Sequence, residues 1–172
     1  SGGGRVSRTR PITPGELRQL LKLLQDPAAL AVRISADTGL RVSDVLGIKC
    51  GELARTMLVT ERKTGKRRKV TLRPATLKAA KAYAKHGGEY LIDCDRSTIY
   101  RRIRKAAAAL GYDHVSMHSI RKLYARRYCA AHGLAATQKE LQHDYLSTTL
   151  LYVLDPAEVE AITKGMGNDV SE

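Results

Sequence analysis

The chain has 172 residues, 43% of them hydrophobic, and carries 30 Lys and Arg against 17 Asp and Glu for a formal net charge of +13. A chain of this length can fold as one globular domain without disulfides or a structural metal. No apolar run approaches the ~20 residues that a bilayer-spanning helix requires, so we expect no membrane partner. The excess of positive charge favours nucleic acid as the partner, ahead of an anionic membrane surface.

Residue types that are rare or absent narrow the interpretation further. The chain has no Phe and no Trp, so its core must be built from Leu, Ile, Val and Ala. It has eight tyrosines, so residue type alone cannot mark one of them as a nucleophile. Its three cysteines, Cys50, Cys94 and Cys129, have no metal-like spacing and predict reduced thiols in a cytosolic protein. We expect neither a metal nor a cofactor.

The pattern along the chain predicts a mainly α fold with a small antiparallel β-hairpin. Residues 1–12 lack apolar periodicity and form a lead-in, whose Gly-rich start we interpret as a linker or tag remnant. A capping signature at 13–16 opens a helix that runs to Leu24. Two strands, 57–61 and 69–72, should form the hairpin, with 53–56 as a candidate third strand. Further helices are expected at 27–38, 43–47, 74–84, 97–110, 117–132, 137–143, 147–153 and 155–164. The domain proper is then 13–154, followed by a C-terminal helix and tail at 155–172.

Two polar clusters lie in the first half of the chain. In Thr-Gly-Leu-Arg-Val-Ser-Asp (38–44), Arg41 and Asp44 are three residues apart, which in most such segments is only a surface pair. At 62–69, six of eight residues are cationic. Such a run is usually a solvated basic hairpin tip, but it also fits a phosphate-contacting loop with one lysine placed to donate a proton.

Two more clusters follow in the second half. In His-Ser-Ile-Arg (118–121), His118 and Arg121 project from the same helix face and could reach one phosphate, although a lone pair of this kind is common on exposed helices. In 141–152, His143 precedes Tyr152 by nine residues. Taken singly, His143 fits a residue favoured at a helix C-terminus, and Tyr152 an ordinary half-buried aromatic.

Together the four clusters fit phosphoryl transfer at a DNA diester without a metal. That chemistry needs a nucleophile, positive donors around the nonbridging oxygens and an acid for the leaving 5′ oxygen. Arginine supplies a bidentate phosphate fork, and a phenolate leaves more readily than an alkoxide, so a tyrosyl link can be reversed. The sequence also lacks the carboxylate cluster of a two-metal nuclease.

From about Thr13 to Leu154 the sequence resembles the tyrosine recombinases, also called the phage integrase family. TGLRVSD is similar to the first arginine box, RKTGKRRKVTL to the hairpin lysine segment, HSIR to the HxxR box and LQHDYLSTTLLY to the segment that ends in the nucleophile. The resemblance implies a tyrosine-recombinase catalytic domain with the catalytic set Arg41, Lys63, His118, Arg121, His143 and Tyr152, supported by Asp44. The sequence departs from the family pattern at Gln142, where glycine is usual, and at Leu151 and Leu154, where polar or basic residues are common.

The resemblance also implies partners: double-stranded DNA, and a homotetramer on DNA joined through the helix at 155–164. A helical N-terminal DNA-binding domain, usual in the family, is missing, so we expect it in a longer form of the protein. The expected location is the cytoplasm, on the nucleoid. Other surface candidates for DNA contact lie in the basic run and on the polar face of the helix at 97–110: Lys66, Arg67, Arg68, Arg101, Arg102 and Lys105.

Three alternatives remain open from the sequence. A type IB topoisomerase uses a similar constellation to relax supercoils, and a telomere-resolving relative would carry it too. A non-catalytic DNA-binding protein could keep the same fold and basic surface. The full set of candidate groups argues against the last alternative, because a retired active site would be expected to lose some of them.

Overall fold

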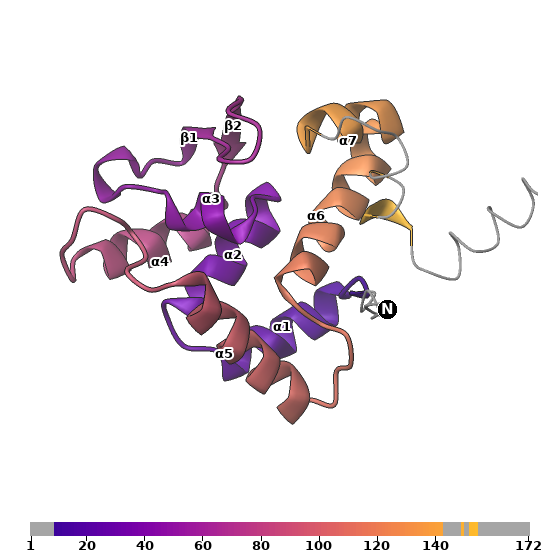
Figure 1. Ribbon diagram of the computed structural model, residues 1–172, viewed down its shortest axis with the longest axis horizontal. Coiled ribbons are helices and arrows are strands. Elements are labelled where there is room, and N and C mark those ends of the chain that lie inside the picture. The colour runs from indigo at the N-terminus through magenta and orange to yellow at the C-terminus, as the bar shows by residue number, and fades with distance from the viewer. Residues whose placement is uncertain (1–8, 143–148, 150–151, 155–172) are drawn as a thin grey trace, which may run out of the picture.

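The computed structural model describes residues 9–142, 149 and 152–154, and these form a helical domain with one short sheet at its edge (Figure 1). In chain order the elements are α1 (Pro14–Leu23), α2 (Ala28–Thr38), α3 (Val42–Leu46), a 3-10 turn (Cys50–Glu52), β1 (Thr56–Thr60), β2 (Arg67–Thr71), α4 (Pro74–Ala84), α5 (Arg96–Ala109), α6 (Met117–His132) and α7 (Leu134–Glu140). The described chain has a single two-stranded sheet, which confirms the predicted fold class. None of the helices in these residues is long and apolar enough to cross a membrane.

Helix α2 lies at the centre of the domain. Nine of its 11 residues are buried, so it is surrounded by protein rather than amphipathic. It packs against α3, α4, α5, α6 and strand β2. The buried cluster around it consists of Leu, Ile, Val and Ala with Met57 and Met117, as the absence of Phe and Trp predicts. Because α2 contacts so many elements, its C-terminal end has a fixed position, and so does the α2–α3 turn that follows it.

Arg10 helps to tie the described end of the lead-in to the domain. Arg10 pairs with Glu16 through two hydrogen bonds of 2.9 and 2.6 Å, and its backbone N–H donates to the carbonyl of His114 at 3.0 Å. The hydrogen bonds from Arg10 lower the pKa of Glu16 to about 2. Glu16 also closes the predicted capping box with Thr13. The described end of the lead-in therefore packs on the domain, with Ile12 only 2% exposed.

The hairpin is antiparallel and pairs Met57 with Val70 and Val59 with Arg68. Alternation along each strand turns Met57, Arg68 and Val70 inward. The candidate third strand at 53–56 is wrong. The segment follows a 3-10 turn at Cys50–Glu52, in which the N–H of Leu53 donates to the carbonyl of Cys50, and its last residue, Thr56, already belongs to β1.

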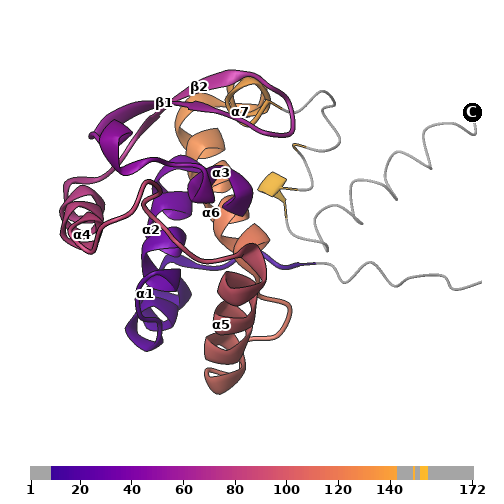
Figure 2. The ribbon, with the colours of Figure 1, turned by 60° about the vertical axis from the view of Figure 1, so that its left-hand side comes forward.

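Helices α6 and α7 form one side of the domain, and α7 lies beside the hairpin at the top of both views (Figures 1 and 2). The sequence predicted α6 with its observed bounds, but α7 begins at Leu134 and not at 137. Gly133, with φ 87°, ends α6 and caps α7 directly. The helices predicted at 147–153 and 155–164 lie largely or wholly outside the described residues, although Thr149, Tyr152 and Val153 are helical.

Candidate active site

A tight turn between α2 and α3 positions Arg41. The hydroxyl of Thr38 donates to the carbonyl of Ile34 at 2.7 Å and accepts from the N–H of Leu40 at 3.2 Å. Gly39 has φ 71°, and a Cβ built there would lie 2.3 Å from Cδ1 of Tyr124. Only glycine fits both the backbone conformation and the approach of this ring. The turn therefore fixes the position of Arg41, the residue directly before α3.

Arg121 of α6 is held by backbone oxygens and faces Tyr152. Its Nε donates to the carbonyl of Gly39 at 2.7 Å, and its Nη2 donates to that of Leu141 at 3.4 Å. Its Nη1 lies 3.3 Å from the phenolic oxygen of Tyr152, and its Cζ lies 5.1 Å from the centre of that ring. Three segments distant in sequence thus meet at one guanidinium that is 2% exposed.

The charge on Arg121 is not neutralised by a carboxylate within the part of the chain that the structure describes. Burial lowers the pKa of Arg121 from its ordinary value, and the positive charges of Arg41 and Arg68 act in the same direction, while Tyr152 opposes them. A buried cation whose partners are neutral oxygens is costly unless an anion completes it. This arrangement suits a site that receives a phosphate.

His118 lies one turn before Arg121, where Ser116 caps the start of α6. Desolvation by the surrounding protein lowers the pKa of His118 below 6.5, and the charges of Arg121, Lys122, Arg41 and Lys63 lower it further. These charged residues come from three elements: α6, the α2–α3 turn and the hairpin loop. All three elements therefore lie close enough to His118 to affect the pKa of its ring. The structure therefore groups His118 with the predicted Arg41, Lys63 and Arg121.

The carboxylate that contacts Arg41 is Glu61, at 3.4 Å between Nη1 and Oε2. Asp44, expected to orient Arg41, is buried and its Oδ1 accepts from the backbone N–H of Arg62 at 2.9 Å. Asp44 thus fixes the start of the loop that carries Lys63. The side-chain contact observed for Asp44 thus runs to the hairpin and not to Arg41.

Lys63 is exposed at the tip of the hairpin. The loop is closed by two backbone hydrogen bonds, from Glu61 N–H to the carbonyl of Lys66 at 2.9 Å and from Gly65 N–H to the carbonyl of Glu61 at 2.8 Å. Gly65 has φ 69°, the left-handed conformation that the turn needs. The lysine is therefore presented to solvent from a closed turn.

The structure corrects one member of the predicted DNA-contact set. Lys66 and Arg67 are exposed, but Arg68 is only 4% exposed. Strand alternation points Arg68 inward, where its Nη1 lies 3.3 Å from Glu61 and its Nε 3.4 Å from Glu140. Arg68 belongs to the interior and not to the surface that DNA could reach.

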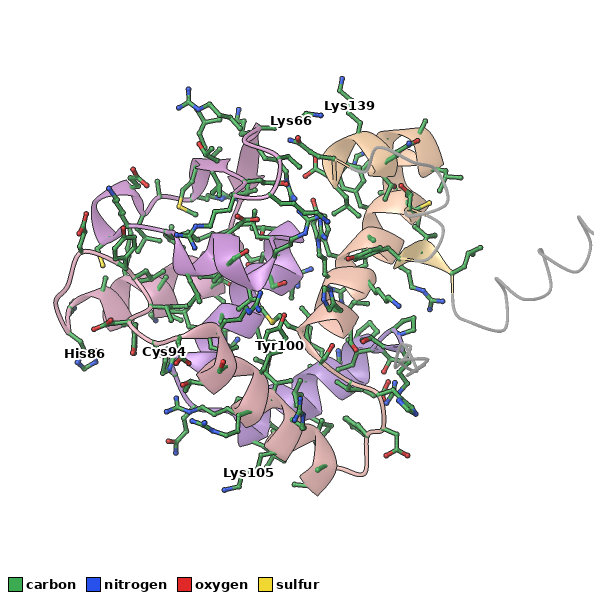
Figure 3. The ribbon with its side chains drawn as sticks, in the orientation of Figure 1. Lys66, His86, Cys94, Tyr100, Lys105 and Lys139 are labelled. Atoms are coloured by element: carbon green, nitrogen blue, oxygen red, sulfur yellow. The ribbon has the colours of Figure 1, made fainter. Side chains whose placement is uncertain are left out.

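Arg101, Arg102 and Lys105 of α5 are exposed, opposite a buried face of the same helix that includes Ile99 and Ile103. Figure 3 shows Lys105 at the end of the molecule opposite to Lys66. The predicted surface residues therefore form two separate regions, the hairpin tip and the outer face of α5.

Two residues near the site were missed from the sequence. Tyr100 of α5 is half-buried, and burial raises the pKa of its phenol, with a smaller contribution from nearby Tyr152. Glu61 continues the inward alternation of Met57 and Val59, and that period of two was the available signal. Tyr100 had no comparable signal. His143, the remaining predicted catalytic residue, lies outside the described residues.

Comparison with known proteins shows the family of the chain. The family model described as "Phage integrase family" matches residues 10–158, most of the chain. The chain belongs to this family. A curated relative, the "Probable integrase/recombinase YoeC" of Bacillus subtilis (strain 168), is 28% identical over 144 residues, 76% of this chain and 80% of that protein.

Two solved structures show that the chain has the fold of the phage integrase family. The XerA recombinase matches with a TM-score of 0.71 at 22% identity over 91% of this chain, and a lambda integrase tetramer bound to a Holliday junction with 0.68 at 22% over 83%. The chain spans 64% of the XerA chain and 48% of the lambda integrase chain. One neighbour is a recombinase and the other an integrase, and at these identities the likeness shows a shared fold.

Proposed function

We propose that the protein is a site-specific DNA recombinase or integrase that cleaves and rejoins DNA through a 3′-phosphotyrosyl intermediate on Tyr152. The phenolic oxygen of Tyr152 attacks the scissile phosphorus and forms a P–O bond, while the bond from phosphorus to the 5′ oxygen breaks. Lys63 gives a proton to the departing 5′ oxygen, and His118 assists proton transfer at the tyrosine or the phosphate. Attack by a 5′-hydroxyl reverses the step.

Arg41, Arg121 and His143 are assigned to the nonbridging oxygens, where negative charge develops as the phosphorus becomes five-coordinate. Asp44 does not contact the DNA in this scheme, but it positions Lys63 by accepting a hydrogen bond from the backbone N–H of Arg62. Because no residue in this scheme requires a metal, the positive side chains carry the whole of the electrostatic stabilisation.

One observation carries the proposal: the buried guanidinium of Arg121 lies 3.3 Å from the phenolic oxygen of Tyr152. A phosphate held by Arg121 is thereby within reach of that oxygen. Among the tyrosines that the structure describes, Tyr152, which the sequence spacing selects, contacts this arginine. Desolvation lowers the pKa of His118, which favours the neutral ring that can accept a proton.

The proposed partners are double-stranded DNA and three further copies of the protein. A solved neighbour, lambda integrase, is a tetramer on a Holliday junction, and the same assembly is proposed for this chain through residues 155–164. A DNA-binding domain preceding the catalytic domain and a place on the nucleoid also belong to the proposal. Arg101, Arg102, Lys105, Lys66 and Arg67 remain the proposed contacts to the DNA backbone.

The test is a covalent trapping experiment. The protein is incubated with a pool of nicked duplexes of randomised sequence, in which the short strand released by cleavage diffuses away and prevents rejoining. We expect a denaturant-stable protein–DNA adduct, and peptide mapping should place the nucleotide on Tyr152.

The matched pair of variants is Tyr152→Phe and Tyr100→Phe, because both remove a phenolic oxygen close to the same site. Tyr152→Phe should abolish the adduct and Tyr100→Phe should keep it. The reverse result would identify Tyr100 as the nucleophile. Adduct formation by both variants would show that neither tyrosine is the required nucleophile. Binding without an adduct in the wild type would favour a non-catalytic DNA-binding protein.

A further inference from the structure

Glu61 connects the α2–α3 turn, which carries Arg41, with the hairpin, which carries Arg68. Its side chain is 1% exposed, and its two carboxylate oxygens contact different arginines: Oε2 lies 3.4 Å from Nη1 of Arg41, and Oε1 lies 3.3 Å from Nη1 of Arg68. Its backbone closes the loop that presents Lys63. The sequence interpretation assigned no role to this residue.

Arg68 explains why Glu61 has a fixed position. Arg68 is buried between Glu61 and Glu140, with its Cζ 5.9 Å from the ring centre of Tyr124. Tyr124 donates a hydrogen bond to Glu140 at 2.9 Å. Arg68 thus holds the Oε1 side of Glu61 and is itself held by Tyr124 of α6 and Glu140 of α7. These contacts restrict the movement of the Glu61 carboxylate.

The two arginines that share Glu61 differ in exposure. Arg68 is sealed in the interior, whereas the side chain of Arg41 is 19% exposed and keeps an edge open toward solvent. A carboxylate shared with a second cation neutralises Arg41 only in part. Such a partner can fix the orientation of the guanidinium while leaving it attractive to a phosphate.

We infer that Glu61 is a positioning residue that orients Arg41 toward the scissile phosphate and is itself held in place by the buried Arg68. The inference rests on the proposed function. Glu61 does not touch the DNA in this scheme and acts through Arg41. Its loss should therefore slow the covalent step without weakening DNA binding, because a small displacement of a catalytic group can cost about a hundredfold in rate.

The variant is Glu61→Gln, which keeps the shape of the side chain and removes its charge. Glu89→Gln is the matched control, because Glu89 forms an ion pair of the same length with Lys49 but is 67% exposed. Under single-turnover conditions with saturating nicked DNA, Glu61→Gln should form the adduct about ten- to a hundredfold more slowly, with an unchanged Kd. Glu61→Asp, which keeps the charge, should recover part of the rate, and Glu89→Gln should match the wild type.

Two modified substrates separate action through Arg41 from action through the Lys63 loop. A sulfur in place of the bridging 5′ oxygen leaves without needing a proton, so it bypasses Lys63. A methyl group in place of a charged nonbridging oxygen removes charge that Arg41 would neutralise. We expect the sulfur substrate to leave the Glu61→Gln defect in place and the methylphosphonate to reduce it.

A measurement on the DNA-free protein covers the case in which the variant is misfolded. Rotation of the Arg41 guanidinium, followed by nitrogen-15 NMR under conditions in which both proteins are folded, should be slow in the wild type and faster in Glu61→Gln. Wild-type adduct rates in Glu61→Gln, or full recovery with the sulfur substrate, would overturn the inference. Absence of any adduct from the wild type would instead reject the proposed function, and the NMR result would then decide the Glu61–Arg41 link alone.

Discussion

Arg121 and Arg41 stand on two sides of the site, and the protein holds them by different means. Arg121 is buried and contacts two carbonyls and a phenol, all neutral. Arg41 is partly exposed and contacts a carboxylate that it shares with Arg68. Backbone oxygens fix a direction without cancelling charge, whereas a shared carboxylate fixes a direction and cancels part of it. The α6 side therefore supplies most of the uncompensated charge, and the hairpin side holds Arg41 in a fixed orientation with part of its charge cancelled.

The strongest way to break the α6 side is through Gly39, which serves both the turn and Arg121. Gly39→Ala forces a left-handed conformation and drives a methyl into the ring of Tyr124, so it should lower the unfolding free energy by more than ~3 kcal/mol. Gly111→Ala has the same φ of 71° with nothing within 4 Å and should cost only ~1 kcal/mol. Urea denaturation measures both. Equal losses would show that the contact with Tyr124 is not what constrains Gly39.

Replacing each buried arginine by methionine tests the contrast in charge directly. Arg68→Met leaves Glu61 and Glu140 without their shared cation and should cost ~3 kcal/mol of unfolding free energy. Arg121→Met removes a buried charge that has no carboxylate among its described partners, and the relief offsets the lost hydrogen bonds. Its unfolding free energy should stay within ~1 kcal/mol of the wild type, although the covalent adduct is lost. A larger loss for Arg121→Met than for Arg68→Met would contradict the contrast.

A smaller effect concerns His118, which the positive charges of both sides reach. Its pKa lies below 6.5 in the folded protein, chiefly through desolvation, so the unfolded chain takes up the proton first as the pH falls. Stability is therefore full above pH 6.5 and declines as the pH drops below it. His118→Gln should flatten that decline, measured as urea midpoints across this range. An unchanged slope in the variant would show that folding does not lower the pKa of His118.

Much of the fold and of the arginine framework follows from local sequence signals. The helix bounds of α4 and α6 and the capping box of α1 are set by residues within one turn, such as Thr13 and Glu16, so the sequence predicts them. The meeting of Arg121 with Gly39 depends on packing across 82 positions, but the motif order indicates it.

What could not be predicted depends on contacts between elements. The pairing of Glu61 with two arginines needs the hairpin to lie against α3 and α7, and no local pattern specifies that placement. The inward direction of Arg68 was hidden by a run of cations, because charge alone suggests a solvated surface. A strand period of two, counted from Met57 and Val70, separates Arg68 from its neighbours once the register is known.

The smallest expected effect lies on the outer face of α5, away from both arginines. If Arg101 contacts a DNA phosphate, Arg101→Gln should reduce the slope of log K against log salt by about one and weaken binding only a few-fold at low salt. Lys81→Gln on α4 is the control, since this exposed residue lies on a helix that Figure 1 shows on the side of the domain away from α6 and α7. Titrations of labelled duplex at several salt concentrations give both slopes. If both variants lower the slope of log K against log salt equally, DNA binding depends on the total charge of the protein and not on Arg101. The buried arginines would then determine where the phosphate is placed.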